Sequence, residues 1–73
     1  MIKGDFVAVL KGRGYKAAVI KHIDKQSVLV KYGDDTFEKI YKNNIIEGAN
    51  FKEQCFLERM FHFEKNIHKN KEE

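Results

Sequence analysis

The chain has 73 residues, 42% of them hydrophobic and 34% charged, with a formal net charge of +3. This length gives one domain with a small core that buries only about 60% of its unfolded surface, and the composition is that of a folded rather than a disordered chain. A single cysteine excludes an intrachain disulfide, and no apolar run approaches the ~20 residues of a membrane span. With no signal-peptide pattern, the sequence predicts an intracellular protein, cytoplasmic or nuclear, without a membrane partner.

The basic excess is confined to the first 48 residues, which hold nine Lys or Arg and six Asp or Glu. The remainder holds five of each. A mildly basic small domain is compatible with DNA, RNA or an acidic protein surface as a partner. The alternative is that these lysines only solvate an ordinary surface.

Residues 1–48 contain five short strand-like segments separated by turn residues. Apolar positions alternate within them, for example at Val28, Val30 and Tyr32, and a local bulge is expected to bring Ile23 onto the face of Ile20. Five short strands are too few for a sandwich, so we predict a mainly β fold, a five-stranded SH3-like barrel. The predicted strands are 6–10, 15–23, 27–32, 36–41 and 44–46.

Residues 49–73 change to a helical period and predict one C-terminal amphipathic α-helix with a polar, mobile tail. Asn50 is the predicted N-cap, with Glu53 as the reciprocal acid of a capping box. The helix is expected to fray near 66–69. Phe51 and Cys55 lie off the main apolar stripe and are expected to meet the barrel at the helix start. The stripe comprises Phe56, Leu57, Met60, Phe61, Phe63 and Ile67.

This stripe is wide for one helix, and two interpretations are open. The helix closes an open end of its own barrel and completes the core, or part of the stripe forms a homodimer seam or docks on another protein. In the second case the interface is predicted at Phe56, Met60, Phe61, Phe63 and Ile67. Either way, Phe56→Glu or Met60→Glu is expected to be severe because it places a charge in apolar contact.

Four segments, GDFVAV at 4–9, GYKAAVIKHI at 14–23, VKYGDDT at 30–36 and Asn44-Ile45, resemble the Tudor-type pattern over about residues 2–46. The family implies a small barrel that binds without catalysis, and many Tudor domains hold methylated Lys or Arg in an aromatic cage by cation–π attraction. By position, Tyr15 and Tyr32 match cage aromatics. Leu10 or Lys11 stands where the family often has Trp.

Other residues complete the ligand site that the resemblance implies. Asp34 or Asp35 would supply its acidic partner, and Phe37 lies nearby in sequence. The alternative is that Tyr15 and Tyr32 close the barrel mouth with their hydroxyls in water.

The same barrel type also serves nucleic-acid binding, in which cations contact phosphates and aromatic rings stack on bases. The residues that would do so are Lys11, Arg13, Lys16, Lys31 and Tyr41.

No nucleophile, base and orienting group stand in a recognisable pattern, and one cysteine gives no zinc spacing. We therefore expect no enzyme activity, no cofactor and no metal. The sequence favours a non-catalytic binding module, a small adaptor or regulator acting through protein contact. A nucleic-acid-binding module and a methyl-lysine or methyl-arginine reader are the alternatives.

Overall fold

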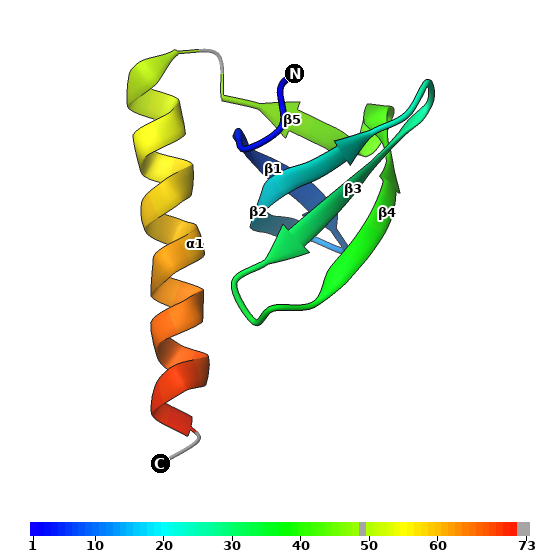
Figure 1. Cartoon of the computed structure of the whole chain (residues 1–73). Coiled ribbons are helices and arrows are strands. Elements are labelled where there is room, and N and C mark those ends of the chain that lie inside the picture. The colour runs from blue at the N-terminus through cyan, green and yellow to red at the C-terminus, as the bar shows by residue number, and fades with distance from the viewer. Residues whose placement is uncertain (49, 72–73) are drawn as a thin grey trace.

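The computed structural model describes residues 1–48 and 50–71, and the side chains as far as residue 67. It shows five antiparallel strands followed by one helix, which confirms the predicted fold class (Figure 1). The sheet order is β4-β3-β2-β1-β5, so β4 and β5 are its edges and the barrel is not closed. The elements are β1 (Phe6–Lys11), β2 (Gly14–Ile23), β3 (Ser27–Tyr32), β4 (Phe37–Tyr41), the 3₁₀ turn η1 (Lys42–Asn44), β5 (Ile45–Glu47) and α1 (Phe51–Lys71).

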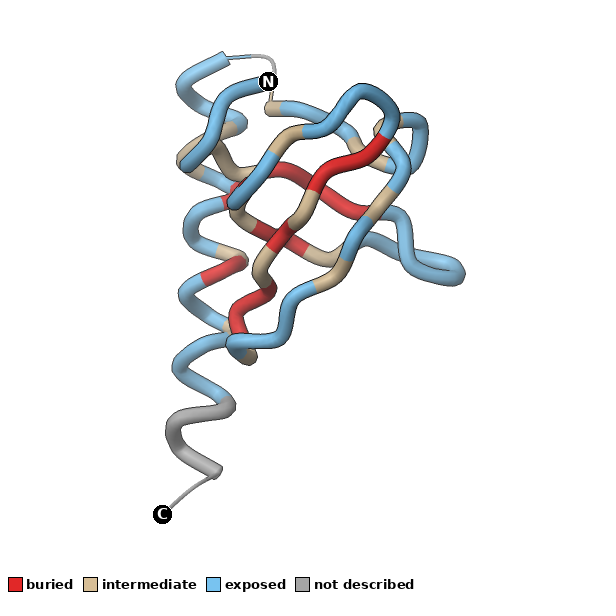
Figure 2. The backbone as a smooth tube through the Cα atoms, turned by 45° about the vertical axis from the view of Figure 1, so that its right-hand side comes forward, coloured by how far each residue is buried: buried red, intermediate tan, exposed pale blue. Residues whose placement is uncertain are grey.

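The inner face of the sheet carries the main core. Strand alternation places small and β-branched side chains there, and the bulge predicted in β2 lies between Ile20 and His22, which sets Ile23 opposite Val28. Figure 2 shows buried residues concentrated in β1, β2 and β3. The core residues are Val7, Val9, Ala18, Ile20, Val28, Val30 and Tyr32.

The turn between β3 and β4 is fixed by its own polar groups. Asp34 Oδ1 accepts hydrogen bonds from the Thr36 amide (3.1 Å) and hydroxyl (2.5 Å). Asp35 adopts φ +67°, a left-handed conformation that Asp tolerates better than most residues. This local chemistry is what the Gly-Asp-Asp-Thr sequence predicts.

Helix α1 begins as predicted and ends later. Asn50 caps it, because its Oδ1 accepts a hydrogen bond from the Glu53 amide at 2.9 Å. The expected fraying near 66–69 is wrong, since the helix continues to Lys71. The expected mobile tail comprises residues 68–73. The side chains from residue 68 onward, and the backbone from residue 72 onward, lie outside the described part of the chain.

The helix packs on its own barrel, but on the outer face of β1 and β2 rather than across an open end (Figure 1). Alternation places Ala8 and Ala17 on this outer face, where their small side chains let the helix approach. A second core forms there from Ala8, Ala17, Leu57 and Phe61, with Phe6, Val19 and Met60 packed around it.

Two contacts hold the helix in place along the sheet. The Gln54 amide accepts from the Phe6 N–H (3.0 Å) and donates to the Phe6 carbonyl (3.0 Å) and the Gly48 carbonyl (3.3 Å), so it pairs with β1 just where β5 ends. At the other end, a Cβ on Gly33 would lie only 2.6 Å from the Phe61 carbonyl oxygen. Phe51, expected to meet the barrel, is 84% exposed, so Gln54 makes that contact instead.

Candidate binding surfaces

A polar network is built around Tyr32, the last residue of β3. Tyr32 is only 3% exposed, and its hydroxyl donates to Glu38 Oε1 at 2.6 Å. Lys16 Nζ lies 4.5 Å from the ring centroid and Lys11 Nζ lies 5.6 Å from it, while Lys11 also pairs with Glu38. The hydroxyl of Tyr32 is therefore bound within the protein, and the expectation that it points into water is wrong.

Lys16 connects three parts of the fold. Its ammonium lies 3.0 Å from Glu64 on α1 and 3.6 Å from Asp34 in the β3–β4 turn. Burial opposes its charge, but the two carboxylates outweigh this effect and raise the pKa of Lys16 above 10.5. The cation over Tyr32 is thus one of the chain's own side chains, held by its own acids.

The same network perturbs its phenol and its acid in opposite directions. Burial, and then the hydrogen bond to Glu38, raise the pKa of Tyr32 above its ordinary value of 10.0. Hydrogen bonds from Lys11 and then Tyr32 lower the pKa of Glu38. Every buried polar side-chain atom in the described part of the chain has a hydrogen-bond partner. The Tyr32 hydroxyl, Lys11 and Lys16 therefore all have partners within the chain.

The structure does not bring the predicted cage residues together. Tyr15 is 60% exposed and lies on the outer face of the sheet beside α1, whereas Tyr32 lies on the inner face. Asp34 binds Thr36 and Lys16, Asp35 pairs with Lys31 at 3.1 Å, and Phe37 is 56% exposed on the outer face of β4.

Of the predicted nucleic-acid residues, Lys11 and Lys16 meet at the Tyr32 ring, whereas Lys31 and Tyr41 lie on the outer face of β3 and β4. Lys11, Lys16 and Lys31 each form an ion pair with a carboxylate of the same chain. Arg13 is exposed in the turn between β1 and β2, and Tyr41 lies at the opposite end of β4 from Phe37.

Tyr41 instead belongs to a row along the outer face of β4. Phe37, Lys39 and Tyr41 alternate with inward residues and are all exposed; we call them the β4 row. The aromatic members are 56% and 65% exposed, and Lys39 Nζ lies 4.0 Å from Asp24. A shallow hollow beside the row is lined by Gln26, Ser27, Lys39 and Tyr41.

An extended apolar surface lies between α1 and the outer face of the sheet. An open hollow of about 450 Å³ runs there, and it continues along the helix past Phe56 and Met60 to Arg59 and Phe63. We call this whole surface the apolar groove. Its residues are Ala8, Tyr15, Ile46, Phe56, Leu57, Met60 and Phe63, with Arg59 at its rim.

Most of the predicted helix interface lies in or beside this groove. Phe56 is 63% exposed, Phe63 68% and Ile67 40%, whereas Phe61 is buried against the sheet. A fully exposed aromatic side chain presents roughly 200 Å², so the exposed side chains of the groove together offer on the order of 500 Å². That is as large as the largest patch on a typical monomer, which is often functional. Because Phe56 is exposed, the expectation that Phe56→Glu is severe does not apply to the isolated chain.

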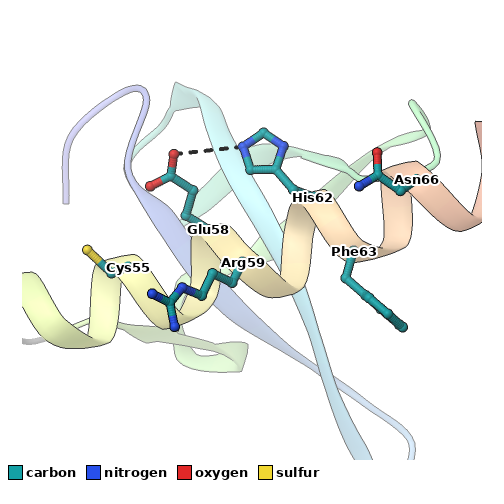
Figure 3. Close-up of a pocket in the computed structure, with 6 residues that line it drawn as sticks. All are labelled: Cys55, Glu58, Arg59, His62, Phe63 and Asn66. Atoms are coloured by element: carbon teal, nitrogen blue, oxygen red, sulfur yellow. Dashed lines mark ion pairs between the residues drawn. The ribbon is translucent and has the colours of Figure 1, made fainter.

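Beside Arg59 and Phe63, α1 also carries several polar side chains. Figure 3 shows Cys55, Glu58, His62 and Asn66 along α1, with His62 paired to Glu58 at 3.7 Å and Phe63 projecting away from that pair. Across the described side chains, no group of three His, Cys, Asp or Glu is arranged to hold a metal ion. None of the helices described is long and apolar enough to cross a membrane.

Sequence reasoning missed Gln54 and Glu64, which join the helix to β1 and β2. A signal was present, because both residues share a helix face with Leu57 and Phe61, and a polar residue on an apolar face needs a partner. Comparison with known proteins found no matching protein-family model, no matching curated protein and no matching solved structure.

Proposed function

We propose that this protein is a non-catalytic binding module that holds a polypeptide partner in the apolar groove. The observation that carries the proposal is the exposure of Phe56, Phe63 and Tyr15 on one continuous surface. Interfaces have aromatic residues and Met at their centres and charged residues at their rims, and Arg59 stands at the rim here. Aromatic side chains in such pockets supply most of the binding energy of an interface.

We further propose a Tudor-like or SH3-like ancestry for the barrel. It is supported by the strand order, in which β1 to β4 pair in sequence and β5 returns to β1, together with the motif residues that shape the β3–β4 turn. The methyl-ligand reader has no such support, because Lys16 already covers the Tyr32 ring and Tyr15 lies on the other face. We therefore do not propose it.

Site-specific photo-crosslinking tests the groove. A photoreactive phenylalanine analogue is placed at Phe56 in the full chain and, as a matched control, at Phe51, which is more exposed but lies outside the groove. We expect discrete polypeptide adducts from position 56 and none of the same mass from position 51. Absence of adducts at 56, or the same adducts at both positions, would refute the proposal.

The β4 row favours a second candidate, the binding of single-stranded nucleic acid. Two exposed aromatic rings with a lysine between them can stack bases and contact phosphate. Tyr41→Ala should weaken binding of a labelled oligonucleotide by about 1–3 kcal/mol, with an affinity that falls steeply with salt. Tyr15→Ala is the control, since Tyr15 lies away from the row. Equal loss in both variants, or affinity independent of salt, argues against this candidate.

A further inference from the structure

Helix α1 carries two separate rows of contact residues. Gln54, Leu57, Phe61 and Glu64 have spacings of three, four and three, and they face the sheet. The second row, which we call the outer row, has spacings of four, three and four. It lies about 110° around the helix from the first row, at 100° per residue. Its members are Phe56, Met60, Phe63 and Ile67.

The outer row has the spacing that two helices use to pack along each other. Apolar residues repeating at an average of 3.5 are the a and d positions of a helix–helix seam. Phe56 and Phe63 are mostly exposed, whereas Met60 packs against the contact that Leu57 and Phe61 fill with the sheet. The spacing therefore indicates a helix as the occupant of the groove.

The two halves of the outer row have different surroundings. Phe56 and Met60 form one wall of the hollow whose other wall is Tyr15 and Ile46. The far half lies toward the C-terminal end of α1, which extends past the sheet (Figure 1). Gly33 meets the helix at residues 61–65, and Ile67 lies beyond that contact with 40% of its surface exposed. The half with Phe56 and Met60 thus lines a hollow that can receive another helix, and the half with Phe63 and Ile67 is an exposed apolar helix end.

We propose that the occupant of the apolar groove is α1 of a second copy of this chain, packed antiparallel in a two-fold dimer. The proposal rests on the proposed function and names its partner. In this arrangement the free helix end of each copy enters the hollow of the other. A two-fold contact of this kind is self-complementary and closed. The outer row of each copy is therefore covered along its whole length by the other copy.

Area and charge agree with this arrangement. The groove and Ile67 offer on the order of 500–600 Å² of exposed apolar surface, against about 800 Å² per partner in a standard interface that includes its polar rim. If Phe56 meets Ile67 of the partner subunit, Met60 meets Phe63 of the partner subunit. Arg59 then lies beside Asn66 of the partner subunit and not beside its own counterpart.

Sedimentation equilibrium of the full chain tests the dimer. We expect twice the chain mass of 8.6 kDa, independent of salt. Phe63→Lys should weaken the dimer about 30-fold or more, the effect of losing a central anchor. Phe51→Lys, the same change at an 84% exposed position outside both rows, should leave the mass unchanged. Circular dichroism checks that both variants fold, which the exposure of both side chains favours.

Cysteine pairing tests the orientation, with Cys55→Ser as the background. The chain with Phe56→Cys and Ile67→Cys should form a covalent dimer on oxidation, and the chain with Phe56→Cys alone should not. Positions 56 and 67 are about 16 Å apart along one helix, so they cannot join within a chain. A covalent dimer from Phe56→Cys alone would show parallel helices and overturn the antiparallel arrangement.

The results separate this inference from the proposed function. A chain that stays monomeric at all concentrations but gives adducts with another polypeptide from position 56 refutes the second copy and upholds the binding module. A monomer without adducts refutes both. A dimer that Phe63→Lys leaves intact also refutes the inference.

Discussion

The clearest test of the fold is Gln54→Ala, because one side chain joins the helix to the edge of β1. The substitution removes the two hydrogen bonds to the Phe6 backbone and the one to the Gly48 carbonyl. It leaves the Phe6 N–H without its acceptor in a partly buried place. Hydrogen bonds contribute about 0.5–1.5 kcal/mol each and an unpaired buried donor costs about 1–3 kcal/mol, so we expect a loss of about 2 kcal/mol.

A loss of this size is large for so small a domain. Small domains have about 0.05–0.15 kcal/mol of stability per residue, and each kcal/mol shifts their Tm by about 4–8 °C. Thermal unfolding followed by circular dichroism should show a Tm lower by about 8–16 °C, with faster hydrogen exchange at the Phe6 amide. Lys52→Ala is the matched control, at an exposed position in the same helical turn. If Gln54→Ala unfolds within about 0.5 kcal/mol of the control, the bridge does not hold the helix.

Three further predictions follow from other contacts. Gly33→Ala places a methyl group against the backbone of α1 and should lower the free energy of unfolding in urea by about 1–3 kcal/mol. Gly14→Ala is the control and should cost far less, because a Cβ there has nothing within 4 Å. Equal losses of stability in the two variants would contradict the close approach. Asn50→Ala removes the helix cap and should lower stability by about 0.5–2 kcal/mol, with loss of helical signal; an unchanged melting curve would show that the cap contributes nothing. The pKa of Tyr32 is raised in the folded protein, so its neutral form favours folding. The contribution of Tyr32 to stability is complete below pH 10.0, its ordinary pKa, and is lost as the pH rises from there toward the raised pKa. The contribution of Lys16 declines in the same direction. The urea midpoint should therefore fall less from about pH 9 to about pH 12 in Tyr32→Phe than in the unaltered chain, and parallel curves would count against the network.

Much of the fold follows from local signals in the sequence. The strands in 1–48 are marked by alternation and by turn residues, and the structure places them within one or two residues of the prediction. The start of α1 is likewise local, because Asn50 caps it with its own side chain. The end of the helix was missed, because the polar residues after Ile67 carry no stop signal such as Gly or Pro.

The candidate site was harder to predict because it depends on which side of the sheet each residue faces. Tyr15 and Tyr32 both match an aromatic pattern, yet they lie on opposite faces of the sheet. The lysines near them appeared free in the sequence, although their carboxylate partners lie on other elements, such as Glu64 for Lys16. A one-dimensional pattern does not contain these pairings, since they join residues far apart in the chain.

The sequence by itself determined the class of fold, the five strands and the capped helix, because each depends on the period of the chain and on neighbours a few residues away. Only the tertiary structure decided where the helix lies. Val7 and Ala8, like Ala17 and Ala18, are apolar on both faces of the sheet, so alternation left both faces available for burial. The small Ala8 and Ala17, the close approach at Gly33 and the Gln54 bridge set the helix on the outer face, and that placement leaves Phe56 and Phe63 exposed.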